Sequence, residues 1–207
     1  TAKLMANLLT GAGADRIVTM DLHAAQIQGY FDIPFDHLYG SSVFRDKIEM
    51  HRKNLVVVSP DVGGIKIARA YAKMLDCGLV VIDKRRPKQN LTEVMNIIGD
   101  VEGKDVLIVD DLIDTAGTFV GAIDALKEKG AQDIYGAITH PVLSGKALER
   151  ISNSKVTKLY ISDTINTEGI DYEKKIQVIT SSELFAEAIR RAFNNESISS
   201  LFHIDKG

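Results

Sequence analysis

The sequence reads Asp110-Asp111-Leu112-Ile113-Asp114-Thr115-Ala116-Gly117-Thr118 directly after the apolar run of residues 106–109. The segment that follows is amphipathic and has the spacing of a helix. Short continuous apolar runs are typical of buried parallel strands, and ligands of open α/β sheets bind at the carboxyl ends of such strands. The stretch therefore predicts a strand, a ligand-binding loop and a helix, in that order.

The loop has the composition of a phosphate site. Ala116 and Gly117 leave the backbone uncrowded, so successive N–H groups at the start of the helix can surround a phosphate dianion. Thr115 and Thr118 add hydroxyl donors. The loop lacks the lysine of the Walker pattern, which excludes the usual nucleotide P-loop.

Two carboxylates, Asp110 and Asp111, precede this loop and would repel a bare phosphate. They make sense if they accept hydrogen bonds from a sugar diol, or if they hold a divalent cation that bridges them to further phosphate oxygens. A sugar phosphate is therefore the predicted ligand. The alternative is a buried strand that ends in a turn, where Asp114 or Thr115 only caps the helix.

Two other predicted strands also end in polar residues. The β-favouring run 17–20 is followed by Asp21-Leu22-His23, and the apolar run 55–58 is followed by Ser59-Pro60-Asp61 and a helix-like stretch over residues 65–75. His23 and Asp61 are therefore candidates for ligand contacts. Each also has a plain alternative, a structural histidine for His23 and a turn residue for Asp61.

Positive charge is concentrated at one place in a chain with a formal net charge of -3. Lys84, Arg85, Arg86 and Lys88 follow a predicted strand over residues 79–82. Lysine and arginine on a closing loop can neutralise the charge that develops during phosphoryl transfer. The alternative is a solvated basic loop. Nucleic-acid binding is disfavoured, because the pI is about 5.9, there is no second basic tract and no aromatic residues alternate with these charges.

Composition supports an α/β protein. The 207 residues are 45% hydrophobic, enough for a sizeable core, and strand-like and helix-like segments alternate. No apolar run approaches the length of a membrane span. The single cysteine, Cys77, excludes an internal disulfide framework and suits the cytoplasm.

Together these segments resemble one enzyme family. Residues 110–118 resemble the 5-phosphoribosyl-1-pyrophosphate (PRPP) binding loop of the type I phosphoribosyltransferases and of ribose-phosphate pyrophosphokinase, also called PRPP synthase. Alanine at position 116 is more like the synthase, since the transferases often carry glycine there. The segments around His23, Asp61 and Lys84 match the synthase in the family's order. The resemblance implies an α/β, type I phosphoribosyltransferase-like fold with a parallel sheet flanked by helices.

The resemblance also implies an activity, the transfer of the β,γ-diphosphate of Mg-ATP to the 1-hydroxyl of ribose 5-phosphate, which gives PRPP and AMP. Lys84 and Arg86 are the implied catalytic residues. His23 is implied in ATP binding, and His23 and Asp61 in binding Mg2+. The implied ribose 5-phosphate site consists of Asp110, Asp111, Asp114, Thr115, Ala116, Gly117 and Thr118.

The resemblance divides the chain into three parts. Residues 1–39 are expected to be the end of an amino-terminal domain, residues 40–193 the carboxyl-terminal domain with the PRPP loop, and residues 194–207 a tail that returns to the amino-terminal domain. Because the family's chains begin well before Thr1, we expect an amino-terminal truncation that removes most adenine contacts and leaves this fragment inactive alone. Apolar residues near both ends are then expected to be exposed, namely Leu4, Met5, Leu8, Leu9, Leu201 and Phe202.

The family is regulated by phosphate and ADP at the interfaces of a homo-oligomer, a hexamer, and parts of that site are matched by Gln28, Asp36, Ser197 and Ser199. No nucleic-acid or membrane partner is expected. Two alternatives stay open. A phosphoribosyltransferase that uses PRPP would leave His23 and the basic segment without a role. A non-catalytic regulatory relative of PRPP synthase is disfavoured, because every recognisable catalytic position is intact.

Overall fold

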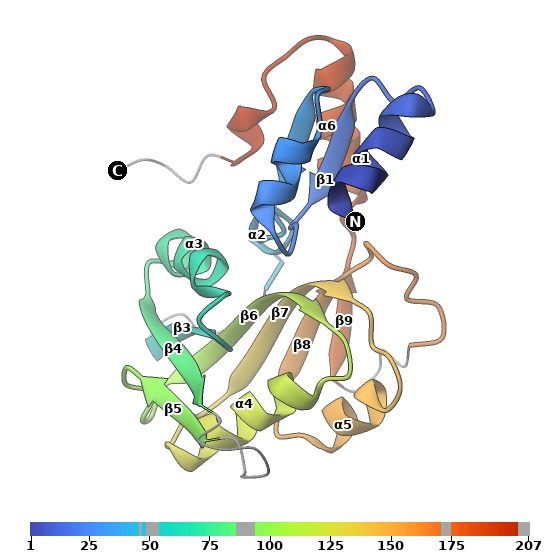
Figure 1. Cartoon of the computed structure of the whole chain (residues 1–207). Coiled ribbons are helices and arrows are strands. Elements are labelled where there is room, and N and C mark those ends of the chain that lie inside the picture. Colours follow the sequence, from blue (N-terminus) through green and yellow to red (C-terminus); the bar gives the residue numbers. More distant parts are fainter. Residues whose placement is uncertain (46, 49–53, 86–93, 171–174, 203–207) are drawn as a thin grey trace.

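Seven strands form one large sheet, in the order β5-β4-β3-β6-β7-β8-β9 (Figure 1). The computed structural model describes residues 1–45, 47–48, 54–85, 94–170 and 175–202. The strands are β3 (Leu55–Ser59), β4 (Gly78–Arg85), β5 (Val94–Ile98), β6 (Asp105–Ile113), β7 (Ile134–Pro141), β8 (Lys158–Ser162) and β9 (Ile176–Ile179). All neighbouring strands are parallel except β4 and β5, which are antiparallel. The predicted α/β fold with a parallel sheet is confirmed, with one antiparallel edge strand.

Helices cover both faces of this sheet (Figure 1). One face packs against α3 (Ile65–Leu75), and the other packs against α4 (Gly117–Glu128) and α5 (Ala147–Asn153). The two core clusters share the strands by alternation, because side chains along a strand point to opposite faces. In β6, Ile108 belongs to the cluster that contains Phe119 of α4, and Leu107 belongs to the cluster that contains Tyr71 of α3. This two-sided burial explains why the strands are continuous apolar runs in the sequence.

A second, two-stranded sheet lies beyond the carboxyl ends of the large one (Figure 1). Its strands β1 (Ile17–Met20) and β2 (Phe35–Leu38) are parallel and are accompanied by α1 (Ala2–Gly11), the 3-10 helix η1 (Ala25–Tyr30) and α2 (Ser41–Phe44). Helix α6 (Ser182–Phe193) runs beside this sheet and is followed by the 3-10 helix η3 (Ser199–Phe202). Ala188 and Ile198 share a core cluster with Met20 and Leu38, so the last described segment packs against the first.

Several predicted elements agree with the structure, and two predicted strands run on by three residues or more. The strand over residues 17–20 and the helix over residues 65–75 have the predicted limits. Strand β6 runs on to Ile113, so Asp110 and Asp111 lie in the strand and not in the loop that follows. Strand β4 runs on to Arg85, so Lys84 is part of a strand and not of a loop. The predicted domain limits at residues 39 and 193 stay a prediction.

The apolar residues near the two ends differ in exposure. Leu4, Met5, Leu8 and Leu9 on α1 are 40–60% exposed, as predicted. Leu201 is half-buried against a core cluster, so the prediction that it is exposed is wrong, while the side chain of Phe202 lies outside the described residues. None of the helices within the described ranges has both the length and the apolar character needed to cross a membrane.

Candidate active site

A histidine from the small sheet meets an aspartate from the large one. His23 follows β1, Asp111 lies near the carboxyl end of β6, and the His23 Nδ1–Asp111 Oδ2 distance is 2.8 Å. Asp111 is buried, whereas 80% of the His23 side chain is exposed. The hydrogen bond to Asp111 and the charge of that carboxylate raise the pKa of His23. The pair therefore presents an anchored imidazole to solvent.

Asp110 adds a second carboxylate whose environment favours its neutral form. Burial, followed by the nearby charge of Asp111, raises the pKa of Asp110 to about 7. The charge of Asp61 contributes in the same direction, and it also raises the pKa of His23. A side chain at Gly64 would place its Cβ 3.7 Å from Asp61 Oδ1 and 3.8 Å from Asp110 Oδ1, so these two carboxylates approach the same backbone position. The structure therefore brings together His23, Asp61, Asp110 and Asp111.

Asp61 is held by its own turn at the end of β3. Its Oδ1 accepts a hydrogen bond from Gly64 N at 2.9 Å, and its carbonyl oxygen accepts one from Ser59 Oγ at 2.7 Å. The plain alternative, a turn residue, thus describes part of what Asp61 does. Its ligand role stays a prediction.

The carboxylates of this site could bind a cation whose other ligands are waters or substrate phosphates. Within the described ranges, no three His, Cys, Asp or Glu side chains are arranged as a ready-made metal centre. Mg2+ is usually bound by one or two carboxylates together with waters and substrate phosphates, which does not require such a centre. Burial is the main cause of the raised pKa of Asp110, and the charges of Asp111 and Asp61 add to it; a bound cation would offset these two charges. The donor set fits Mg2+ bound together with a phosphate ligand.

The predicted phosphate loop connects β6 to α4. Ala116 is buried at the amino-terminal cap of α4 with a φ of 60°, in the left-handed region. Thr115, Gly117 and Thr118 are exposed, so the loop presents its donors to solvent. The Asp114 carboxylate accepts a hydrogen bond from the Ser144 hydroxyl, and the Asp114 carbonyl accepts one from Ser144 N at 3.1 Å. The segment after β7 therefore fixes the start of the loop.

Arg150 supports the loop from α5, a contact that no sequence motif indicates. Its Nη1 donates a hydrogen bond to the Thr115 carbonyl oxygen at 2.7 Å, and a Cβ at Gly117 would lie 3.8 Å from the same nitrogen. Arg150 also lines an open cavity of about 310 Å³ between α4 and α5. Because 35 residues separate Arg150 from Thr115, local spacing could not have predicted their contact.

Comparison with known proteins shows the family of this chain. Residues 84–203 match the family of the phosphoribosyl synthetase-associated domain. The ribose-phosphate pyrophosphokinase of Chlorobaculum tepidum is 60% identical over 204 residues, which are 98% of this chain and 63% of that protein. The chain belongs to the ribose-phosphate pyrophosphokinase family. The enzyme of Campylobacter jejuni with the same name is 55% identical and covered to 65% of its length.

A solved structure supports the family's fold. The phosphoribosylpyrophosphate synthetase of Mycobacterium smegmatis superposes with a TM-score of 0.86 at 38% identity, over 94% of this chain and 64% of that one. The chain therefore spans a little less than two thirds of these relatives of the pyrophosphokinase family.

The two predicted catalytic residues of this pyrophosphokinase family member are Lys84 and Arg86. Lys84 lies in β4, where it pairs with Met95 of β5, and one strand, β3, separates β4 from β6. Arg86 lies outside the described residues. The catalytic roles of both stay predictions.

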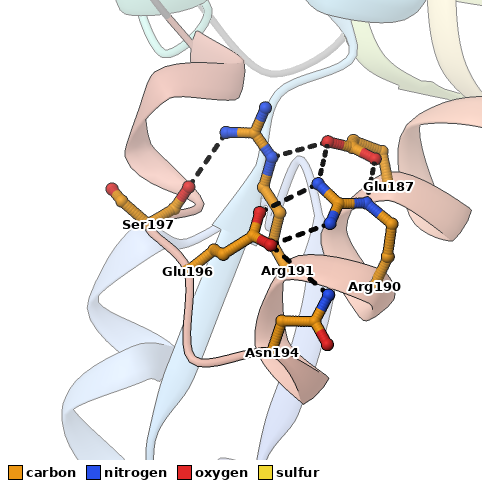
Figure 2. Close-up of polar contacts among 6 residues, drawn as sticks. All are labelled: Glu187, Arg190, Arg191, Asn194, Glu196 and Ser197. Atoms are coloured by element: carbon orange, nitrogen blue, oxygen red, sulfur yellow. Dashed lines mark hydrogen bonds and ion pairs between the residues drawn. The ribbon is translucent and has the colours of Figure 1, made fainter.

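The predicted regulatory residues lie in the small sheet and the 3-10 helix η1, and in the segment that follows α6. Gln28 in η1 hydrogen bonds to the ring of His37, and Asp36 in β2 accepts hydrogen bonds from the Arg16 guanidinium. Figure 2 shows the segment after α6, where Arg191 Nη1 donates to the Ser197 carbonyl oxygen at 3.0 Å. Ser199 begins η3 directly after this network. Their regulatory role stays a prediction.

The network in Figure 2 joins the end of α6 to the segment after it. Glu187 pairs with Arg190 and Arg191, and Arg190 also pairs with Glu196. The hydrogen bonds from Arg190 and Arg191 lower the pKa of Glu187 to about 2. Arg190 and Arg191 thus form their ion pairs with the carboxylates of Glu187 and Glu196.

Proposed function

We propose that this family member is a ribose-phosphate diphosphokinase. The oxygen of the 1-hydroxyl of ribose 5-phosphate attacks the β-phosphorus of ATP, the bond between that phosphorus and the α-phosphate oxygen breaks, and PRPP and AMP form with release of the hydroxyl proton. Since the chain spans about 63% of its relatives, the activity is proposed for a protein that also carries their remaining part.

The observation that carries the proposal is the hydrogen bond between His23 and Asp111. It joins the Asp21-Leu22-His23 segment to the strand before the phosphate loop, across 88 residues of sequence. A phosphoribosyltransferase that uses PRPP gives no role to His23. A diphosphate transfer does, because the phosphates of ATP must lie beside the ribose 5-phosphate in the same site.

Each described group has a proposed task that suits its position. The amides of residues 114–118 and the hydroxyls of Thr115 and Thr118 bind the 5-phosphate, and Asp110 and Asp111 accept hydrogen bonds from the ribose hydroxyls. His23 and Asp61 face the ATP phosphates. Bound Mg2+ neutralises phosphate charge, and His23, Asp61 and the β6 carboxylates are the groups that would hold it. Lys84 and Arg86 stabilise the charge on the moving diphosphate.

Steady-state assays of PRPP and AMP formation by the protein at the length of its relatives test the proposal. Lys84→Ala should lower kcat by about 10²–10³-fold with little change in ribose 5-phosphate affinity, because its charge acts on the transferred group. Asp114→Ala should instead weaken ribose 5-phosphate binding and leave kcat nearly unchanged. Lys129→Ala, at the exposed carboxyl end of α4, is the matched control. Wild-type protein that forms no PRPP from Mg-ATP and ribose 5-phosphate would refute the proposal.

For the 207-residue chain itself we propose a low activity, regulation by small molecules and assembly into an oligomer. The resemblance places most adenine contacts in the part of the relatives that this chain does not span, so the chain alone should form little or no PRPP. Phosphate and ADP are the proposed regulators, and a homo-oligomer, a hexamer, is the proposed assembly. Sedimentation velocity with and without phosphate measures the assembly directly.

A further inference from the structure

The turn between β1 and His23 is fastened to the large sheet by a buried carboxylate. Asp21 is 6% exposed and has a φ of 36°, a left-handed conformation that is uncommon for a residue other than glycine. Its Oδ2 accepts hydrogen bonds from Thr139 Oγ1 at 2.6 Å and from Gly40 N at 3.0 Å. Thr139 belongs to β7 of the large sheet, whereas Gly40 follows β2 of the small one. One carboxylate oxygen therefore links the two sheets.

Gly40 fits this link because it has no side chain. A Cβ at position 40 would lie 2.5 Å from Asp21 Oδ2 and closer still to Thr139 Oγ1. Contacts this short require the carboxylate or the strand to move. The glycine thus permits the close approach of three segments that are far apart in the sequence.

The residues on either side of Asp21 are held as well. His140 Nε2 faces the carbonyl oxygens of Met20 at 3.0 Å and Asp21 at 3.2 Å, so it carries the proton and donates to them. Leu22 N donates to His37 Nε2 at 3.0 Å. Three consecutive residues before His23 are therefore fixed by groups of other elements, and the next residue is the imidazole that meets Asp111.

We propose that Asp21, Thr139 and Gly40 form a clamp that positions His23 across the junction of the two sheets. These are positioning residues: the Asp21 carboxylate is buried and faces two donors, so it acts on a ligand only through His23. What His23 then does for a ligand rests on the proposed function. The geometry of the clamp is independent of the proposed function.

The first test reads the clamp in the 207-residue protein without any ligand. Histidine labelled with 15N reports the hydrogen bond at His23 Nδ1 through its chemical shift at one fixed pH, and His23→Gln assigns the signal. Thr139→Val removes the hydroxyl at nearly constant volume and should move the His23 Nδ1 shift toward that of free imidazole. Thr139→Ser keeps the hydroxyl and should preserve the wild-type shift.

Thr157→Val is the matched control, because Thr157 Oγ1 also donates to an aspartate, Asp133, at 3.0 Å but at the opposite end of the strands. It should leave the His23 signal unchanged. A folded Thr139→Val protein with the wild-type His23 shift overturns the proposal. If that variant does not fold, hydrogen exchange in the wild type decides: slow exchange of the Gly40 amide supports the clamp, and exchange as fast as that of exposed loop amides overturns it.

A second test separates the clamp from the proposed function. In the protein at the length of its relatives, Thr139→Val should lower kcat by about 10- to 100-fold with little change in the KM for ribose 5-phosphate, because small displacements of a positioned group are costly. If the wild type forms no PRPP but the His23 shift still depends on Thr139, the clamp stands and the proposed function fails. A fall in ribose 5-phosphate affinity without a change in kcat overturns the positioning role.

Discussion

Asp110 illustrates how a single residue of the site reduces the stability of the ligand-free protein. Burial and the charge of Asp111 raise its pKa from 3.8 to about 7, so the folded state retains a proton that the unfolded chain has lost. Because the folded state binds this proton more tightly than the unfolded chain, the free energy of unfolding falls as the pH rises from about 4 to about 7. At pH 8 the loss approaches about 4 kcal/mol as an upper bound.

We therefore expect Asp110→Asn to stabilise the ligand-free protein, and to do so more at pH 8 than at pH 5. Urea unfolding at both pH values measures the effect. Asp124→Asn, an exposed aspartate on α4, is the control and should change little. Equal stabilisation by Asp110→Asn at both pH values would show that the carboxyl group does not titrate as described.

In the phosphate loop, the backbone conformation restricts which residue can occupy position 116. Ala116 has a φ of 60°, a left-handed conformation that costs any residue other than glycine roughly 1–2 kcal/mol. We expect Ala116→Val to lower the free energy of unfolding by about 1–3 kcal/mol, because the site is buried and this conformation is least accessible to a β-branched side chain, and to weaken ribose 5-phosphate binding. Ala116→Gly should be tolerated, because glycine adopts this conformation without strain. Thermal unfolding and calorimetric titration measure the two effects. Ala125→Val, in the helical part of α4, should cost less, and an equal cost would contradict the argument.

The contact between α5 and the same loop gives a second prediction. Arg150→Gln removes the charged donor to the Thr115 carbonyl and should weaken ribose 5-phosphate binding by roughly tenfold, because a hydrogen bond from a charged group contributes about 1.5–3 kcal/mol. Calorimetric titration measures this loss. Arg69→Gln, on the exposed side of α3, should bind as the wild type does. Unchanged binding by Arg150→Gln would mean that the loop holds its shape without α5.

Element types followed from the sequence better than element ends. The helix over residues 65–75 has a strong period, and its limits were predictable from that local signal. Strand β6 continues past Asp110 and Asp111 because Leu112 and Ile113 pair with His140 and Pro141 of β7, and a run of apolar residues cannot show such a partner. The antiparallel β5 at the edge was missed for the same reason.

At the scale of the whole molecule, predictability of the site depended on the distance between partners. The phosphate loop is one continuous stretch, so its composition alone indicates a phosphate ligand. The proximity of His23 to Asp111, and the support from Arg150, arise only when distant segments meet. The position of His23 after a predicted strand and the family resemblance both indicated this residue, but no pattern indicated Arg150 or the buried Asp21–Thr139 contact.

The last described segment should stabilise the molecule through one apolar side chain more than through its charges. Ile198 is 6% exposed and shares a core cluster with Met20 and Leu38 of the small sheet, whereas the Arg190 ion pairs are exposed to solvent. Ile198→Ala should lower the free energy of unfolding by about 2–4 kcal/mol, because it leaves a cavity between α6 and the small sheet. Arg190→Ala should change it little, since exposed ion pairs are screened by water and salt. Urea unfolding of both variants compares them directly, and a larger loss for Arg190→Ala would mean that the network in Figure 2, and not the apolar contact, fastens this segment.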